Sequence, residues 1–194
     1  MSSPVLRLNN RNSVLAAGAC ALAVVFAAPA SASVLVLGNG AAADCSRAAF
    51  AGRSDLASIK TCNTALEVER LDRRDRAGTL VNRGVMQLRT KAYVAARRDF
   101  DAAIRLAPKL GEAYVNRGVS RMADAAYAEA LDDVNLGLSL GVKEPAKAYY
   151  NRALVQESLG QARAAWLDYR KAQELAPEWE APGRQLARFT VRTR

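Results

Sequence analysis

Two cysteines, Cys45 and Cys62, are the first side chains whose type and spacing could support chemistry. The chain has no histidine, which excludes a histidine general base, a histidine metal ligand and an imidazole pH switch. Its three cysteines include no C-x-x-C pair, so they cannot supply the four thiolates of a structural zinc or iron–sulfur site. We therefore expect no enzyme activity, no metal and no cofactor.

A glycine-rich stretch is the second chemical candidate. Residues 34–43 have the pattern of a strand followed by G-x-G-x-x-A, a dinucleotide-binding turn. That turn works only between a parallel strand and a helix N-terminus, with an acid about 20 residues further on. No later stretch has the pattern of a central parallel strand, so we expect no nucleotide cofactor.

The N-terminus has the pattern of a secretory signal. Residues 1–13 carry Arg7 and Arg11 and no acid, an apolar run follows from Val14 to Ala28, and residues 30–32 read Ala-Ser-Ala. Small residues at the first and third positions are typical of a signal peptidase site. We expect cleavage after Ala32 and an exported, periplasmic protein. The alternatives are an uncleaved membrane anchor, which needs about 20 apolar residues, and a lipoprotein that uses Cys20.

Export would change the net charge of the chain and the oxidation state of its cysteines. Residues 1–32 hold two of the 28 basic residues and none of the 19 acids, so the mature chain is near +7. This charge permits long-range attraction to anionic lipids or polymers. Cys45 and Cys62 are the two cysteines of the mature chain, and an oxidising compartment favours a disulfide between them. A catalytic cysteine is the alternative, but the chain has no histidine to act as its base.

The rest of the chain consists of a repeat of 34 or 35 residues. Residues 77–110, 111–144 and 146–179 align, with small and apolar residues recurring at i, i+4 and i+7 as on one face of a helix. The aligned positions include Asn82, Asn116 and Asn151, followed by Arg83, Arg117 and Arg152. Neither helix of a unit could bury its apolar stripe alone, so stacking of units must build the core.

This pattern resembles the tetratricopeptide repeat family. The resemblance implies an all-α, right-handed solenoid of antiparallel helix pairs, with about three and a half repeats and a C-terminal capping helix. The expected organisation is a signal peptide (1–32), a flexible tail (33–43), a disulfide-stapled partial repeat (44–76), three full repeats (77–110, 111–144 and 145–179), and a capping helix with a tail (180–194).

The resemblance also places the terminal elements. Cys45 and Cys62 fall at positions that face each other across a helical hairpin in the family, so the disulfide would join helices at about 44–51 and 55–70. At the other end, residues 181–191 are expected to form the capping helix. Its basic stripe would hold Arg184, Arg188 and Arg192.

Three arginines depart from the family, which usually has leucine at positions 83, 117 and 152. An aspartate follows each of them 16 residues later. We expect three ion pairs that join the two helices of a unit or join one unit to the next: Arg83 with Asp99, Arg117 with Asp133, and Arg152 with Asp168. The alternative is that the arginines read an anionic ligand.

In this family the first helix of each unit lines a concave groove. The corresponding positions here are Val81, Asn82, Val85, Val115, Asn116, Val119, Lys147, Tyr150, Asn151 and Leu154. An asparagine amide has a donor and an acceptor, so it can pair with a peptide backbone whatever the side chains are. The alternative is that these asparagines bond within the helices. The carboxylate clamp of chaperone-binding members is represented here only by Asn116 and Lys147.

The sequence thus predicts an exported protein-interaction module that binds a peptide segment or a helix of a partner in its groove. The alternative is a surface-associated protein whose arginines 184, 188, 192 and 194 meet anionic lipid or polymer at the membrane periphery. Nucleic acid is not an expected partner. Neither the partner nor the oligomeric state follows from the sequence.

Overall fold

The computed structural model describes residues 5–8 and 29–192 of the chain. The apolar run of the expected signal peptide, Cys20 and Arg194 lie outside these residues. The described part contains nine α-helices and two short strands. Their bounds are β1 Val5–Leu8, α1 Ala41–Phe50, α2 Leu56–Val68, α3 Arg73–Arg89, α4 Tyr93–Leu106, α5 Gly111–Met122, α6 Tyr127–Leu140, α7 Pro145–Ser158, α8 Ala162–Leu175, α9 Glu180–Leu186 and β2 Phe189–Arg192.

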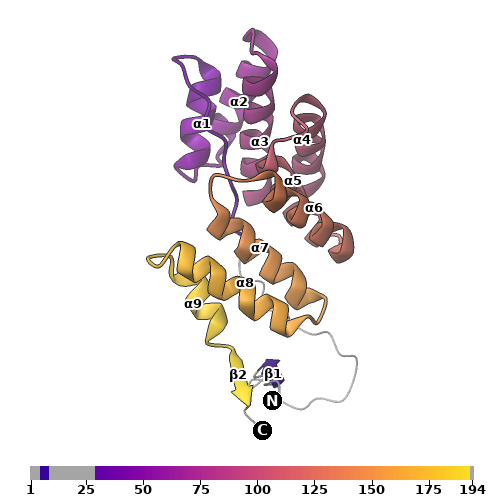
Figure 1. The fold of residues 1–194 in the computed structure, drawn as a ribbon. Helices are drawn as coiled ribbons and strands as arrows, with labels where there is room; N and C mark the ends of the chain where they lie inside the picture. The colour runs from indigo at the N-terminus through magenta and orange to yellow at the C-terminus, as the bar shows by residue number, and fades with distance from the viewer. Residues whose placement is uncertain (1–4, 9–28, 193–194) are drawn as a thin grey trace.

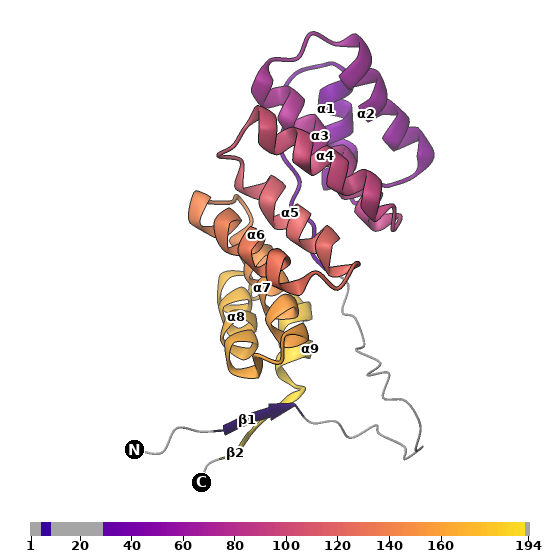
Figure 2. The same ribbon diagram turned by 90° about the vertical axis from the view of Figure 1, so that its right-hand side faces the viewer.

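Successive helices form hairpins that stack into an elongated array from α1 to α9 (Figures 1 and 2). In two of the hairpins, α3–α4 and α5–α6, the helices cross closely because one of them has a glycine at the contact. A Cβ atom on Gly84 of α3 would lie 2.5 Å from Cε1 of Phe100 in α4, and one on Gly118 of α5 would lie 2.8 Å from Cγ2 of Val134 in α6. Phe100 and Val134 are fully buried. The predicted all-α solenoid of antiparallel helix pairs is therefore confirmed.

Local signals set the helix boundaries. Asp55 and Asp72 precede α2 and α3 and accept hydrogen bonds from the backbone N–H groups of Ser58 and Asp75, which caps both helices. The Glu69 carboxylate accepts from the first N–H groups of α1, at Ala41 and Ala42. Capping by Glu69 begins α1 at Ala41, three residues earlier than the sequence predicts.

The helix packing is tightest where α5 begins and α6 ends. A Cβ atom on Gly111 would lie 2.6 Å from the carbonyl oxygen of Gly137 and closer still to that of Gly141. Both obstacles are backbone atoms, which cannot rotate away. Gly111→Ala is therefore expected to lower the free energy of unfolding by about 2 kcal/mol, the usual effect of overpacking, as measured by urea denaturation.

Gly183→Ala is the matched control. A Cβ atom on Gly183 of α9 would meet Gln173 Oε1 at 2.9 Å, and this flexible side chain can move. We expect a change of less than about 0.5 kcal/mol. Equal losses for the two variants would contradict the close approach at Gly111.

The C-terminal end differs from the sequence prediction. The helix expected over residues 181–191 is α9, which ends at Leu186, and the chain continues into β2. β2 pairs antiparallel with β1, with Leu8 opposite Phe189. A turn at residues 187–188 separates α9 from β2. It brings the buried Phe189 ring to 6.1 Å from the Tyr169 ring, in a T-shaped arrangement. Burial of Phe189 against α8 favours the turn over a longer helix.

No helix in the described ranges is both long and apolar enough to span a membrane.

Candidate functional site

The three aligned asparagines occupy the same position on α3, α5 and α7. Asn82, Asn116 and Asn151 are fully buried. A buried amide must satisfy both its donor and its acceptor, because an unpaired polar group in the interior costs about 1–3 kcal/mol. The partners of these amides therefore decide between the structural and the binding interpretation.

The partner is the chain itself. Residues 30–36, here called the groove segment, run extended along the array from α7 towards α1, as the indigo trace shows (Figures 1 and 2). Asn151 accepts from the Ala30 N–H at 2.9 Å and donates to the Ala30 carbonyl at 2.6 Å. Asn116 does the same with Ala32, at 3.2 and 2.7 Å. Each such pair of hydrogen bonds is called a rung.

The ladder continues beyond these two rungs. Asn82 accepts from the Val34 N–H at 2.8 Å and donates to the Val34 carbonyl at 2.7 Å. Ser46 of α1 then accepts from the Val36 N–H and donates to the Val34 carbonyl, both at 3.1 Å. The bonded residues are every second residue of the segment, which matches the two-residue period of an extended chain. One helical unit therefore holds two residues of peptide.

Recognition in the ladder is through the backbone, but the side chains are sorted by size. Ala32 and Ser33 are 1% and 3% exposed, whereas Leu35 and Leu37 are 49% and 79% exposed. A Cβ atom on Gly78 of α3 would lie 2.9 Å from Val34 Cγ1, so glycine is needed where the segment crosses this helix. The inward side chains are thus alanine near α5 and valine near α1, where Val34 and Val36 are also buried, and the larger leucines lie outward.

The groove segment overlaps a region that the sequence assigned otherwise. Residues 33–43 were predicted to form a flexible tail, but Ser33, Val34 and Val36 are buried and residues 41–43 belong to α1. The difference arises because partners distant in sequence, at Asn82 and Ser46, satisfy the backbone of this stretch.

The predicted groove residues divide into two sets. Val81, Val85 and Val119 are buried in one cluster with Val34, and Lys147 and Tyr150 line a pocket of about 450 Å³ beside Ala30. Val115 and Leu154 lie elsewhere: Val115 packs with Val134 and Ala148 between units, and Leu154 belongs to the C-terminal cluster.

The pocket beside Ala30 extends the groove towards α9. Its lining also includes Pro29, Ser31, Arg89, Trp179, Ala181, Arg184 and Gln185. Burial raises the pKa of Tyr150 above its ordinary value. Three basic side chains line this end of the groove, but two of them are paired with carboxylates: Lys147 with Glu144 and Arg184 with Glu180.

The three arginines each make a forked pair with the aspartate of their own unit. Arg83 donates from Nε and Nη2 to the two carboxylate oxygens of Asp99, both at 2.7 Å. Arg117 and Arg152 bind Asp133 and Asp168 in the same way, at 2.7–2.9 Å. The hydrogen bonds to Asp99 raise the pKa of Arg83. The forked donors of these arginines are thus occupied by aspartates of the fold, which disfavours the alternative that they bind an anionic ligand.

The remaining arginine nitrogen, Nη1, bonds to the preceding unit. Arg83 donates to Asn63 at 2.8 Å, Arg117 to Asp101 at 2.9 Å and Arg152 to Asn135 at 3.0 Å. These acceptors occupy equivalent positions on α2, α4 and α6. Each arginine therefore joins the helices of its own unit and also joins that unit to the one before it, so both structural alternatives hold at once.

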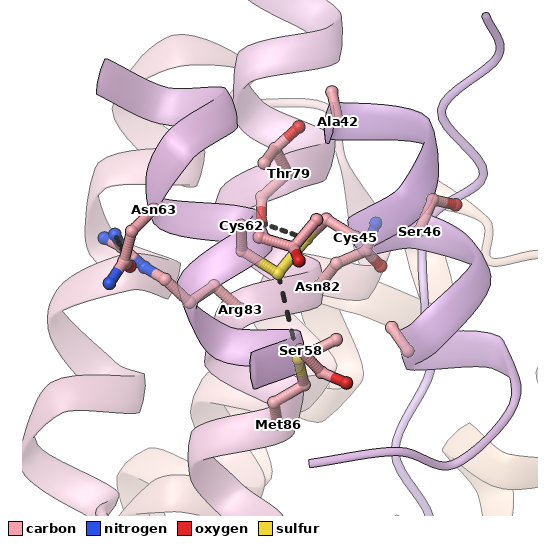
Figure 3. Close-up of a disulfide and its surroundings, with 12 residues drawn as sticks. Ala42, Cys45, Ser46, Ser58, Cys62, Asn63, Thr79, Asn82, Arg83 and Met86 are labelled. Carbon is pink, nitrogen blue, oxygen red and sulfur yellow. Dashed lines mark hydrogen bonds between the residues drawn. A yellow bond between two sulfur atoms is a disulfide. The ribbon is translucent and has the colours of Figure 1, made fainter. Parts of the chain in front are cut away.

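Cys45 and Cys62 form a disulfide between α1 and α2, with both side chains fully buried. Figure 3 shows the bridge next to Met86 and Thr79 of α3. The bridge joins the two helices of the first hairpin and packs against Met86 of α3, and Cys45 is next to Ser46, the residue at the end of the ladder.

The basic C-terminal stripe is partly neutralised within the fold. Arg184 pairs with Glu180 at 2.7 Å, and Arg188 pairs with Glu157 at 2.5 Å. The carboxylates leave less unpaired charge for an anionic surface than the sequence suggests. In the described part of the chain, no cluster of three or more metal-binding side chains occurs.

Comparison with known proteins supports the fold and leaves the protein's activity open. No protein-family model matches the chain. The chain is 33% identical to the human and rat serine/threonine-protein phosphatase 5 over 89 residues. The matched region covers 46% of this chain and 18% of the phosphatase. The chain thus spans less than a fifth of the length of these relatives.

Similar solved structures are tetratricopeptide (TPR) domains and MamA. They include the first TPR domain of Spaghetti (RPAP3) bound to an HSP90 peptide, with 23% identity, a TM-score of 0.54 and coverage of 59% of this chain and 90% of that one. The Arabidopsis OM64 TPR domain has 22% identity, a TM-score of 0.55 and coverage of 60% and 95%. MamA has 20% identity, a TM-score of 0.56 and coverage of 73% and 80%. The fold of this protein is a tetratricopeptide-repeat solenoid.

Proposed function

We propose that the protein is an exported peptide-binding module whose groove captures an extended segment of a partner. The observation that carries the proposal is the ladder itself: Asn82, Asn116 and Asn151 each hold one residue of extended chain by both its N–H and its carbonyl. Such contacts use atoms that every peptide has, so they provide affinity without requiring a particular sequence.

Two further observations support peptide capture. The similar RPAP3 domains were solved with an HSP90 peptide and with an HSP70 peptide. In this protein, cleavage after Ala32 would remove the residues that fill the Asn116 and Asn151 rungs. The mature protein would then have a groove that is half filled by its own chain and half open.

Export is tested by intact mass spectrometry of the protein recovered from the cell envelope, before and after reduction with thiol labelling. We expect a chain that begins at Ser33, with two thiols that react only after reduction. A full-length chain with reactive thiols would contradict export and place the partner search on the other side of the membrane.

Peptide capture is tested by fluorescence anisotropy with the mature chain and a labelled peptide that copies residues 27–32. We expect Asn151→Ala to weaken binding by about tenfold or more, because it removes both hydrogen bonds of one rung. Asn135→Ala is the matched control, since this asparagine also loses a hydrogen bond but lies on α6, outside the ladder. Equal binding by the two variants would show that the groove is not the site.

A further inference from the structure

The groove segment crosses the predicted cleavage point. The peptide bond between Ala32 and Ser33 lies inside the groove, with both residues almost fully buried. Cleavage there divides the ladder into two parts. The Asn151 and Asn116 rungs lose Ala30 and Ala32, whereas Asn82 and Ser46 keep Val34 and Val36.

The retained part of the segment stays anchored after cleavage. Val34 keeps both hydrogen bonds to Asn82 and a third to Ser46. Its side chain remains packed against Gly78 and in the cluster of Val81 and Val85. The new N-terminus at Ser33 is therefore held one residue from an intact rung, with its amino group facing the vacated half of the groove.

The chemistry of that amino group specifies a ligand. An α-amino group has a pKa of about 7.7–8.0 and is mainly protonated at neutral pH. It takes the place of a neutral amide nitrogen that was bonded to the Ala32 carbonyl carbon. A peptide that re-enters the vacated rungs in the same direction would present its own C-terminal carboxylate at this point. Ammonium and carboxylate then form a charge-assisted hydrogen bond, about twice as strong as a neutral one.

We propose that the mature protein binds the C-terminal tail of a partner protein, with the tail's free carboxylate against the Ser33 ammonium and its last residues on the Asn116 and Asn151 rungs. This proposal rests on the proposed function and on cleavage after Ala32. It deepens that function by naming which end of a partner the groove takes, and it makes the protein's own N-terminus part of the binding site.

The structure also restricts the side chains of the tail. Its last residue takes the place of Ala32, which is 1% exposed, and its third-last residue takes the place of Ala30, which is half-buried. The last residue must therefore be small, such as alanine, serine or glycine. The tail must shift by roughly 2 Å from the intact segment, because a covalent C–N bond of about 1.33 Å becomes a hydrogen-bonded contact.

The test uses the chain that begins at Ser33, obtained by secretion of the full sequence and freed of bound peptide by unfolding in urea and refolding with the disulfide intact. The probe is the labelled peptide Ala-Ala-Pro-Ala-Ser-Ala with a free carboxylate. The same peptide with a C-terminal amide is expected to bind about tenfold more weakly. A peptide with phenylalanine as its last residue is expected to bind at least as weakly. The full-length chain, whose rungs are filled, is expected to bind none of the three.

The outcomes separate this proposal from the proposed function. If acid and amide bind equally and Asn151→Ala weakens both, the groove captures peptides but the Ser33 ammonium does not recognise a carboxylate, and the proposal is overturned. If neither peptide binds, both ideas fail. A tail ending in phenylalanine that binds as well as alanine would overturn the size restriction. A mature chain that begins elsewhere than Ser33 would overturn the proposal at its first step.

Discussion

Arg83→Met is expected to lower the free energy of unfolding by about 3 kcal/mol, measured by urea denaturation. The substitution removes the forked pair and leaves the Asp99 carboxylate, 8% exposed, without its cation. Loss of one partner from a buried pair typically costs about 3–5 kcal/mol, and the partial exposure of Arg83 places this pair at the lower end. The contact of Arg83 with Asn63 in the preceding unit is lost as well.

Two further variants show whether the buried charge is the cause. Arg98→Met removes an arginine that is exposed on α4 and should change stability by less than about 0.5 kcal/mol. The double variant Arg83→Leu/Asp99→Leu removes both charges and should recover most of the loss, since apolar replacement of a whole buried pair is often neutral. A double variant as unstable as Arg83→Met would mean that the unit requires the hydrogen bonds themselves.

Replacing both disulfide cysteines by alanine is expected to lower the free energy of unfolding by about 3 kcal/mol, because a loop of 17 residues is no longer closed in the unfolded chain. The loss should be local. In a repeat array each unit contacts mainly its neighbours, so terminal units can unfold first. We expect α1 and α2 to exchange their amide hydrogens faster, while α5 to α8 keep their protection.

The same variant connects stability with the groove. Ser46 is on α1 and bonds the last part of the groove segment, so loosening α1 should also raise amide exchange at Val36. The Val34 amide, held by Asn82 of α3, should change less. Uniform loss of protection over all nine described helices would contradict a local role for the bridge.

The repeat architecture was predictable because its determinants are local. The spacing of Gly84 in one helix and Phe100 in the next determines which faces are apolar and where two helices can cross closely. The same local frame revealed the pairing of Arg83 with Asp99, since two helices joined by a short turn bring residues 16 positions apart together. The contacts of these arginines with Asn63, Asp101 and Asn135 obey the same repeat and could have been found from the aligned positions.

The occupant of the groove was not predictable in this way. The segment has a two-residue period, as an extended chain does: two alanines and then two valines occupy every second position, at Ala30, Ala32, Val34 and Val36. The same residues also fit a signal peptidase site and the start of a glycine-rich stretch. Either of these local interpretations explains the residue types without an extended segment bound in the groove. The hydrogen bonds that decide the matter join residues 84 and 121 positions apart, and no periodicity connects them.

The sequence by itself determined a stack of helical hairpins, the three aligned asparagines and the arginine–aspartate pairs, because each depends on the spacing of residues within one or two neighbouring helices. Only the tertiary structure decided that the asparagines hold an extended chain, and that this chain is the protein's own residues 30–36. A buried amide needs a donor and an acceptor wherever they lie in the sequence. Stacking of the units creates a line of such amides at the spacing of an extended peptide, and this line exists only once the array has folded.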